Sequence, residues 1–253
     1  MDEQINYSIV IPAYNEEGGI TASLTQVMNY MSSFDPLFEV IIVDDGSTDS
    51  TAQKVEDYAQ YHSEITLIKN PHKGKAASVI TGVTAAKGKY ILTADADMAT
   101  PIDELKRFVH WIDDHNFDAV IASREGAGSK RQGEPISRRV IGRAFNLFVR
   151  LVALPNFADT QCGFKLYKGE MAHDVFSRLK VYSDKDKVIK KPFFGAFDVE
   201  VIFIAKKRGY KLKAVPVTWT YIKTNRLNFW GNSVRMAWDV IKIRLNGLKG
   251  VYK

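Results

Sequence analysis

Short apolar runs that alternate with segments of helical periodicity fill the first half of this 253-residue chain. The runs read YSIVIPAY, FEVIIVDD, ITLIKN, YILTAD and FDAVIAS, and each has the length and composition of a buried strand. Helices are expected between them, at 17–33, 49–62, 75–86 and 102–115. Parallel neighbouring strands need such crossover helices. The alternation therefore predicts an α/β fold with a mostly parallel central sheet flanked by helices.

The second half of the chain has a less regular pattern. It predicts a helix at 137–153, a short strand in GFKLYKG, a charged loop in SDKDKVIKK and a helix at 197–210 that ends at Gly209. The segment 211–222 alternates as a strand, and Pro216 inside it predicts an edge strand or a bulge. The last periodic stretch, 229–250, predicts a basic amphipathic helix.

The single cysteine, Cys162, cannot form an internal disulfide, which fits a reducing, cytoplasmic setting. No CxxC motif or Cys/His cluster is present, which argues against a structural zinc site. The N-terminal residues lack the basic and apolar regions of a signal peptide. No run of about eighteen apolar residues without a charge predicts a spanning helix.

Charge is divided unevenly along the chain. Residues 1–122 hold 8 Lys+Arg and 19 Asp+Glu, and residues 123–253 hold 27 and 10, so the overall charge of +6 hides a basic second half. Such an excess favours an anionic partner: nucleic acid, an anionic membrane surface or a phosphorylated substrate. The alternative is that helix surfaces simply carry Lys and Arg.

Polar and mostly acidic residues follow four of the expected strands, in PAYNEE, DDGSTD, ADAD and SRE. Ligands of open α/β sheets bind at these carboxyl ends. Asp95 and Asp97 would face the same side if their strand continued, and the small Ala96 would leave room for a ligand. Two carboxylates suit Mg²⁺ or Mn²⁺. Alone, the pair is more readily interpreted as two solvated aspartates in a turn.

The ends of two neighbouring strands make a ligand site more plausible than it is from the aspartate pair alone. Asp44 and Asp45 could accept hydrogen bonds from a nucleobase or ribose, with Gly46 allowing a tight turn. Tyr14 could stack on a base, and Glu16 could accept a hydrogen bond. Each feature alone is better explained as a loop turn or a helix start. Their occurrence together favours a metal and nucleotide site.

Four segments, IVIPAYNEE, EVIIVDDGSTDST, HKGKAASVITGVTAAKGKYILTADAD and ASR, together resemble the family-2 glycosyltransferases, which have the GT-A nucleotide-diphospho-sugar transferase fold. Four other segments are similar to the dolichyl-phosphate β-glucosyltransferase branch, to which the dolichyl-phosphate mannose synthases are related. They are DADMAT, ADTQCGFKLYKG, FGAFDVEVIFIAKKRGYKLKAVPVTW and NSVRMAWDVIKIRL. That branch more often reads Asp-Ala-Asp-Gly-Ala-Thr, and Met98 replaces its glycine here.

The resemblance implies an inverting transfer of a hexose, with glucose favoured, from a nucleotide-sugar to a polyprenyl (dolichyl or undecaprenyl) phosphate at the cytoplasmic face of a membrane. UDP-glucose is the favoured donor and GDP-mannose the alternative. The implied cofactor is Mg²⁺ or Mn²⁺, with Asp97 as its main ligand and Asp95 touching ribose or metal. The residues implied for the nucleotide-sugar are Pro12, Tyr14, Glu16, Asp44, Asp45, Lys75, Asp95, Ala96, Arg124 and Arg226.

The acceptor decides which further residues take part. A phosphate monoester has a second pKa of about 6, so it is largely dianionic near neutral pH and needs no strong general base. It does need cations, for which the candidates are Arg138, Arg139 and Lys165. The residues implied for catalysis are Asp97, Arg124, Asp159 and Asp198. If the acceptor were a hydroxyl of a glycan or cell-envelope molecule, Asp198 would be the base.

Within this interpretation the chain divides into a GT-A domain at 1–228 and a basic amphipathic C-terminal extension at 229–253. The domain would comprise a nucleotide-binding half, 1–125, and an acceptor half, 126–228. The helices at 137–153 and 229–246 could lie in a membrane interface, with Trp230 and Trp238 near the headgroups. They could equally pack against the core, as most amphipathic helices do. We expect a peripheral membrane protein.

Two other function classes have less support. A nucleic-acid-binding module could use the basic half, but the acidic strand ends would repel phosphates unless a metal intervened, so no nucleic-acid partner is expected. A Rossmann oxidoreductase is disfavoured because no GxGxxG motif follows the first strand.

Overall fold

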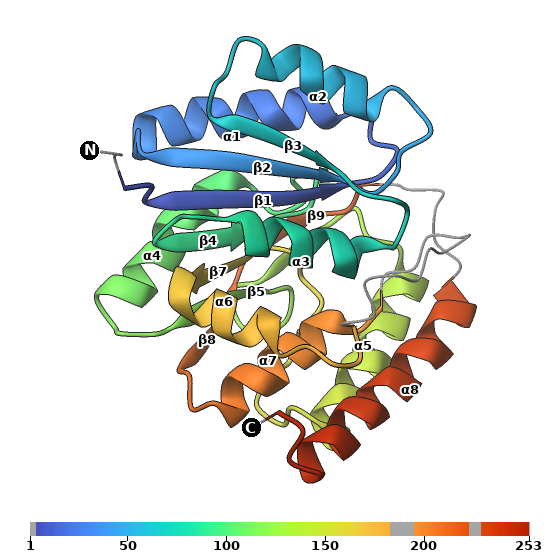
Figure 1. Cartoon of the computed structure of the whole chain (residues 1–253). Helices are drawn as coiled ribbons and strands as arrows, with labels where there is room; N and C mark the ends of the chain where they lie inside the picture. Colours follow the sequence, from blue (N-terminus) through green and yellow to red (C-terminus); the bar gives the residue numbers. More distant parts are fainter. Residues whose placement is uncertain (1–3, 183–194, 223–228, 253) are drawn as a thin grey trace.

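The computed structural model describes residues 4–182, 195–222 and 229–252, and the side chains of the last helix from residue 234 onward. Its centre is a seven-stranded sheet with the order β3-β2-β1-β4-β7-β5-β8 (Figure 1). All neighbours run parallel except β7, which is antiparallel to β4 and β5. The strands are β1 (Tyr7–Ala13), β2 (Phe38–Asp44), β3 (Ile65–Lys69), β4 (Tyr90–Thr93), β5 (Ala119–Ser123), β7 (Lys165–Lys168) and β8 (Leu212–Pro216).

Helices cover both faces of this sheet, which explains why its strands read as continuous apolar runs. In β1, Ile9 and Ile11 lie in the core on one face and Val10 lies in the core on the other. The first face is covered by α1 (Ile20–Phe34), α2 (Thr51–Ala59) and, after a 3-10 turn at Ile102–Glu104, α4 (Leu105–Asp113). The second is covered by α3 (Lys75–Ala85), α6 (Gly169–Ser177) and α7 (Phe197–Lys207). The predicted α/β architecture is confirmed.

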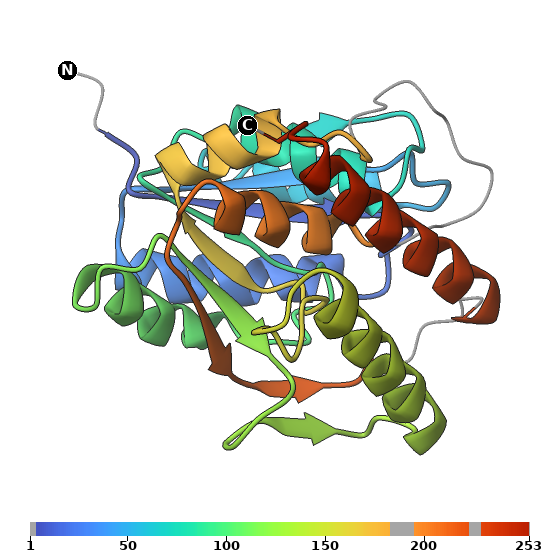
Figure 2. The same ribbon diagram turned by 90° about the horizontal axis from the view of Figure 1, so that it is seen from below.

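Two longer helices, α5 (Ile136–Val152) and α8 (Phe229–Leu248), pack against each other outside the second layer (Figures 1 and 2). Val149 of α5 and the side chains of Val240 and Ile243 of α8 point into the core. In the part of the chain that the structure describes, no helix has both the length and the apolar character that a bilayer crossing requires.

The second half departs from the expected elements in three places. The strand expected over 211–222 is divided: Pro216 ends β8, which is an edge strand as expected, and β9 (Thr218–Thr220) pairs with β6 (Lys130–Gln132) in a separate two-stranded sheet. β6 reads Lys-Arg-Gln, so apolar periodicity could not reveal it. α6 had no counterpart in the pattern analysis, although Met171, Val175 and Phe176 form a buried helical face. The charged loop SDKDKVIKK lies outside the described residues.

We expect Gly82→Ala to destabilise the fold, although alanine favours a helix. Gly82 lies in α3 where the helix touches the sheet, and a Cβ built there would lie 2.3 Å from Val10 Cγ1 and 3.1 Å from Val43 Cγ2. Overpacking should lower the free energy of unfolding by about 1–3 kcal/mol, measured by urea denaturation. Gly142→Ala is the control, since no atom other than those of its chain neighbours and its own helix backbone lies within 4 Å of its built Cβ, and it should raise that free energy by about 0.5–1 kcal/mol. Equal stability of the two variants would contradict the close approach.

Candidate active site

The sheet order reverses between β1 and β4, because β2 and β3 extend from one side of β1 and the remaining strands from the other. In open α/β sheets this switch point leaves a crevice at the carboxyl ends of the strands. The loops after β1, β2 and β4 meet there (Figure 1). The start of β7 joins them, because this antiparallel strand begins opposite the end of β4, with Lys165 paired to Thr93.

The loops after β1 and β2 are bound to each other by hydrogen bonds. The backbone N–H of Asn15 donates to Ser47 Oγ at 2.9 Å, and that of Thr48 donates to Asn15 Oδ1 at 2.8 Å. Asn15 has φ 52°, a left-handed conformation that asparagine tolerates. The neighbouring Tyr14 ring stacks on His72, with ring centroids 4.2 Å apart and planes at 14°. An aromatic surface is thus held at the end of β1.

Asp44 and Asp45 use their carboxylates differently. Asp45 Oδ1 accepts from the backbone N–H groups of residues 73 and 74 at 2.8 and 3.0 Å, and its Oδ2 lies 2.8 Å from His72 Nδ1, so this side chain holds the loop before α3. Asp44 Oδ2 accepts from the Ser47 N–H at 3.1 Å, whereas its Oδ1 is buried without a hydrogen-bond partner among the described residues. An unpaired buried carboxylate oxygen is costly, so Asp44, unlike Asp45, keeps an acceptor atom whose hydrogen-bonding capacity is unused.

Asp95 and Asp97 lie in a tight turn. β4 ends at Thr93, and the Met98 N–H donates to the carbonyl oxygen of Asp95 at 3.0 Å. The expectation that the aspartates could share one face of a continuing strand is therefore wrong, and the turn brings their charges close instead. Met98 has φ 47°, a left-handed conformation that glycine adopts most easily.

Lys75, the first residue of α3, forms an ion pair with Asp95. Burial lowers the pKa of Lys75, but the carboxylates of Asp95 and Asp198 outweigh burial and raise it. Burial likewise raises the pKa of Asp95, but the surrounding cations, first Lys75 and then Lys165, lower it. Both members of the pair therefore carry their charge, and Asp95 lies in a field of positive charge from several elements.

Arg124, just after β5, makes a two-pronged ion pair with Asp159. Its Nε and Nη2 donate to Oδ2 and Oδ1 at 2.8 and 2.9 Å, and its backbone N–H donates to Oδ2 at 2.9 Å. Asp159 is fully buried; burial raises its pKa, but the guanidinium outweighs burial and holds the pKa at about 2. The pair links the end of β5 to the loop that precedes β7 and fixes the plane of the guanidinium.

A second buried ion pair joins β7 to α7. Lys165 is 1% exposed, pairs with Asp198 in the first turn of α7 and donates to the carbonyl oxygen of Cys162 at 2.5 Å. Removing one partner would leave the other charge buried and unpaired, so such a pair holds its two elements together. Lys165, expected as a cation for the acceptor, is thus engaged inside the protein.

Two arginines contact the Trp219 ring of β9. The guanidinium carbon of Arg124 lies 5.3 Å from the ring centroid, and that of Arg138 lies 5.8 Å from it. Arg138 also lies 4.8 Å from the Tyr221 ring centroid. These contacts, of cation–π type, place the first turn of α5 next to the end of β5. Arg139, the next residue of α5, is exposed.

The two aspartates of the turn could hold a divalent cation. Burial, and then the adjacent charge of Asp95, raises the pKa of Asp97 to about 6, and a cation would relieve this repulsion. Carboxylate oxygens are ligands that Mg²⁺ and Mn²⁺ prefer. The described residues contain no group of three or more His, Cys, Asp or Glu side chains suited to a metal. Further ligands would come from water or from a bound diphosphate.

Interactions connect most of the residues that the sequence singled out, and Arg226 lies outside the described residues. Those gathered around the crevice are Pro12, Tyr14, Glu16, Asp44, Asp45, Lys75, Asp95, Ala96, Asp97, Arg124, Asp159 and Asp198. Sequence reasoning missed His72, Gly163 and Trp219. All three stand in segments that carry the family resemblance, His72 in HKGK, Gly163 in QCGF and Trp219 in PVTW, but the sequence did not show which residues they contact.

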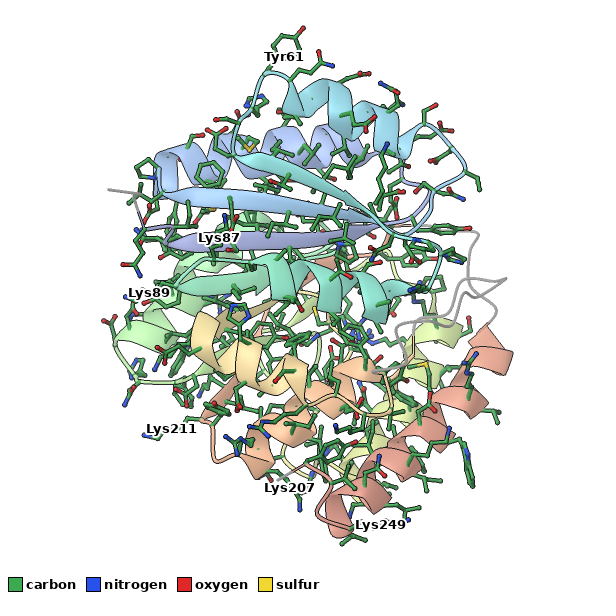
Figure 3. All side chains as sticks on the ribbon, in the orientation of Figure 1. Tyr61, Lys87, Lys89, Lys207, Lys211 and Lys249 are labelled. Atoms are coloured by element: carbon green, nitrogen blue, oxygen red, sulfur yellow. The ribbon has the colours of Figure 1, made fainter. Side chains whose placement is uncertain are left out.

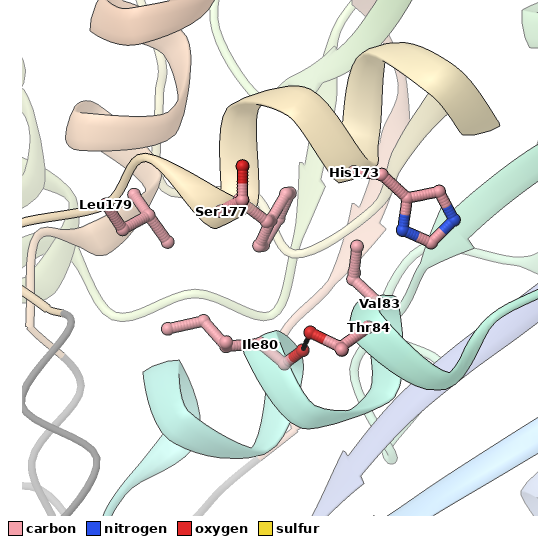
Figure 4. A pocket seen from close by; sticks show the side chains of 7 residues that line it. Ile80, Val83, Thr84, His173, Ser177 and Leu179 are labelled. Carbon is pink, nitrogen blue, oxygen red and sulfur yellow. Dashed lines mark hydrogen bonds between the residues drawn. The ribbon is translucent and has the colours of Figure 1, made fainter.

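A separate cavity of about 360 Å³ lies between α3 and α6 (Figure 4). It is lined by Ile80, Val83, Thr84, His173, Phe176, Ser177 and Leu179. None of these was predicted as a site residue, and the two buried ion pairs and the aspartate turn do not line it. The ion pairs and the aspartate turn therefore make the strand ends, and not this cavity, the candidate active site.

Comparison with known proteins identifies the family of this chain. Residues 8–176 match the family described as Glycosyl transferase family 2. This chain belongs to glycosyl transferase family 2. The glycosyltransferase is 32% identical over 267 residues to the dolichyl-phosphate β-glucosyltransferase of Dictyostelium discoideum, and the alignment covers 99% of this chain and 77% of that relative.

Two solved structures share the fold. A mannosyltransferase from Pyrobaculum calidifontis in complex with GDP-Man and Mn²⁺ superposes with a TM-score of 0.58 at 18% identity, over 98% of this chain and 75% of that one. The second is glucosyl-3-phosphoglycerate synthase from Mycobacterium tuberculosis in complex with Mn²⁺, UDP-Glc and phosphoglyceric acid. It superposes with a TM-score of 0.64 at 16% identity, over 95% of this chain and 80% of that one. The predicted GT-A fold of the glycosyltransferase is confirmed.

We expect the metal-free enzyme to lose stability as the pH rises from about 4 to about 6. The pKa of Asp97 rises from its ordinary 3.8 to about 6 on folding, so the folded chain binds this proton more tightly than the unfolded chain. This contribution to the free energy of unfolding is fully present below the pKa of the unfolded chain, 3.8, and is lost as the pH rises through the pKa of the folded chain, about 6. Thermal unfolding in EDTA across this range should show the loss, and Asp97→Asn should flatten it. The same slope in both proteins would contradict the assignment.

Proposed function

We propose that this glycosyltransferase moves glucose from UDP-glucose to the phosphate of a polyprenyl lipid, dolichyl or undecaprenyl phosphate, with inversion at the anomeric carbon. The relationship to a dolichyl-phosphate β-glucosyltransferase over 99% of the chain carries this choice. GDP-mannose is the alternative donor that the assay below discriminates.

The crevice offers groups that match a uridine nucleotide. Tyr14 presents an aromatic ring at the end of β1, on which a base can stack. Uracil carries one N–H on its pairing edge, and the unpaired Asp44 Oδ1 can accept it. Asp45 supports the pocket by holding the loop at 72–74. Pro12, Glu16 and Ala96 would line the remainder of the nucleotide pocket. Arg226 is a proposed ligand of the diphosphate.

The proposed reaction needs charge neutralisation more than proton removal. An oxygen of the acceptor phosphate, largely dianionic because its second pKa is about 6, attacks the anomeric carbon. The bond from that carbon to the diphosphate oxygen breaks, and UDP leaves with the electron pair. Lys75 and Arg124 are the cations beside the leaving diphosphate, held in place by Asp95 and Asp159. A divalent cation on the aspartate turn would supply Lewis-acid stabilisation of the same group.

Arg138 is the cation best placed for the acceptor phosphate. It contacts the same Trp219 ring as Arg124, so it lies close to the proposed diphosphate site. Its helix, α5, begins with Ile136 and Val140 exposed, at 81% and 61%. A phosphate bound at Arg138 can therefore stay attached to a lipid chain that follows the apolar surface of α5.

The outer sides of α5 and α8 form a surface, called here the membrane face, that would contact the bilayer. Its exposed large apolar side chains are Ile136, Val140, Leu147, Leu151, Val234, Trp238, Leu245 and Leu248. α5 also carries four arginines and no acidic residue. Apolar groups interspersed with arginine suit the headgroup region of an anionic membrane. The side chain of Trp230 lies outside the described residues.

A donor screen tests the reaction. Purified protein would be incubated with radiolabelled UDP-glucose, UDP-N-acetylglucosamine or GDP-mannose, together with a polyprenyl phosphate and Mn²⁺. The lipid would then be extracted, and the label in the organic phase counted. We expect label from UDP-glucose alone and its loss with EDTA. Asp97→Ala should reduce transfer at least about a hundredfold with an unchanged circular dichroism spectrum. Asp114→Ala, whose side chain is 62% exposed on the surface, should transfer at the wild-type rate.

The other outcomes of this screen are also informative. Lipid label from GDP-mannose alone would assign mannose and overturn the choice of sugar. Unchanged turnover in Asp97→Ala would exclude the metal role of the turn. Bound UDP without lipid label from any donor would overturn the lipid acceptor and favour a hydroxyl acceptor. Asp198→Asn would then be the variant to compare, because Asp198 would be the base in that reaction.

We expect the membrane face to carry vesicle binding. Leu147 and Leu151, 54% and 78% exposed, lie one turn apart on α5, and changing both to Glu should lower binding to vesicles of phosphatidylcholine and phosphatidylglycerol at least about tenfold in co-sedimentation. Tyr61→Glu is the matched control, because Tyr61 is 84% exposed at the opposite end of the molecule (Figure 3). Equal binding by the double variant and the control would contradict this surface.

A further inference from the structure

Gly163, in the loop before β7, lies directly against the carboxylate of Asp95. A Cβ built on Gly163 would lie 2.3 Å from Asp95 Oδ2 and 2.4 Å from both Cγ and Oδ1. Such distances leave no room for any side chain while Asp95 keeps this position. Gly163 is absent from the glycines with positive φ, so its backbone conformation does not demand glycine. The requirement at this position is therefore one of space.

The backbone around Gly163 is fixed on both sides. Its carbonyl oxygen accepts from Thr93 Oγ1 at 3.1 Å, and the carbonyl oxygen of the preceding Cys162 accepts from Lys165 Nζ at 2.5 Å. The Phe164 carbonyl oxygen accepts from the Ala122 N–H at 3.0 Å. Since Lys165 is itself held by its buried ion pair, the loop has little freedom to withdraw. A side chain at 163 would therefore displace Asp95, whose carboxylate is the end of a rotatable side chain.

We propose that Gly163 is a positioning residue for Asp95. Its missing side chain provides the space in which the Asp95 carboxylate can pair with Lys75 and at the same time face the donor site. The buried pair of Lys165 and Asp198 holds the backbone of Gly163 in this position. Asp198 therefore affects the position of Asp95 indirectly, through Lys165 and the loop that contains Gly163. The proposal rests on the proposed function only in that Asp95 contacts the donor or its metal.

A double-mutant cycle tests this role, with wild type, Gly163→Ala, Asp95→Ala and the double variant. The first measurement is the affinity for UDP in the presence of Mn²⁺ by calorimetry, which needs neither sugar nor lipid. We expect Gly163→Ala to weaken binding at least about tenfold, because displacement of Asp95 changes the orientation of a group that contacts the donor or its metal. The double variant should bind no more weakly than Asp95→Ala, because the added methyl group has no carboxylate left to displace.

The second measurement is the thermal unfolding midpoint of the same four proteins without any ligand. Gly163→Ala should lower the midpoint in the wild-type background and should leave it unchanged in the Asp95→Ala background, where the methyl group enters vacated space. This arm reports on the contact between residues 163 and 95 even if the enzyme uses another donor. Gly142→Ala, which meets no neighbouring atom, is the control and should leave UDP affinity unchanged.

Two results would overturn the proposal. One is wild-type UDP affinity in Gly163→Ala. The other is independent behaviour in the cycle, in which the two substitutions multiply their losses of affinity and lower the unfolding midpoint separately. Failure of lipid glucosylation in the donor screen would overturn the proposed function alone, because this cycle uses neither lipid nor sugar.

Discussion

The placement of the Asp95 carboxylate is the constraint on which the rest of the candidate active site depends. This one group pairs with Lys75 at the start of α3, lies against Gly163 before β7, and adds to the effect of burial in raising the pKa of Asp97 in its own turn. Lys165 and Arg124 add positive charge around it. Four separated segments of the chain are thus organised around a single negative charge.

Alternating charge explains how so many ionised groups share a small volume. Lys75, Arg124 and Lys165 each face a carboxylate, of Asp95, Asp159 and Asp198 in turn. A buried charge is tolerated only when it is paired and hydrogen-bonded, so each pair ties the two elements that supply it. Asp97, which is half-buried, accepts a hydrogen bond from the Ala99 N–H at 3.1 Å but forms no ion pair among the described residues, and its raised pKa marks it as the carboxylate whose repulsion a cation would relieve. In the proposed reaction, the same arrangement would provide fixed partners for the charges of a diphosphate.

The uneven charge of the chain has a spatial counterpart. The acidic first half supplies the strand ends around the proposed nucleotide site, whereas the basic second half supplies α5, α8 and the two arginines on Trp219. Arg124 and Arg138 both contact the Trp219 ring, so the end of β5 lies beside the first turn of α5. In the proposed reaction a water-soluble donor and a lipid acceptor approach from the crevice and from the membrane face, and their phosphates meet at the arginines.

The sequence by itself determined the architecture of the first half and the acidic strand ends, because strand and helix periods are local properties and β1 to β5 carry them clearly. It also pointed to most of the residues in the crevice. It did not reveal β6, whose three polar residues have no period, nor that Asp95 and Asp97 lie in a turn. The contacts of Arg124 with Asp159, of Lys165 with Asp198 and of Gly163 with Asp95 were decided only by tertiary structure. Each joins residues far apart in the chain, and they meet because β7 enters the sheet antiparallel between β4 and β5, a strand order that no local pattern encodes.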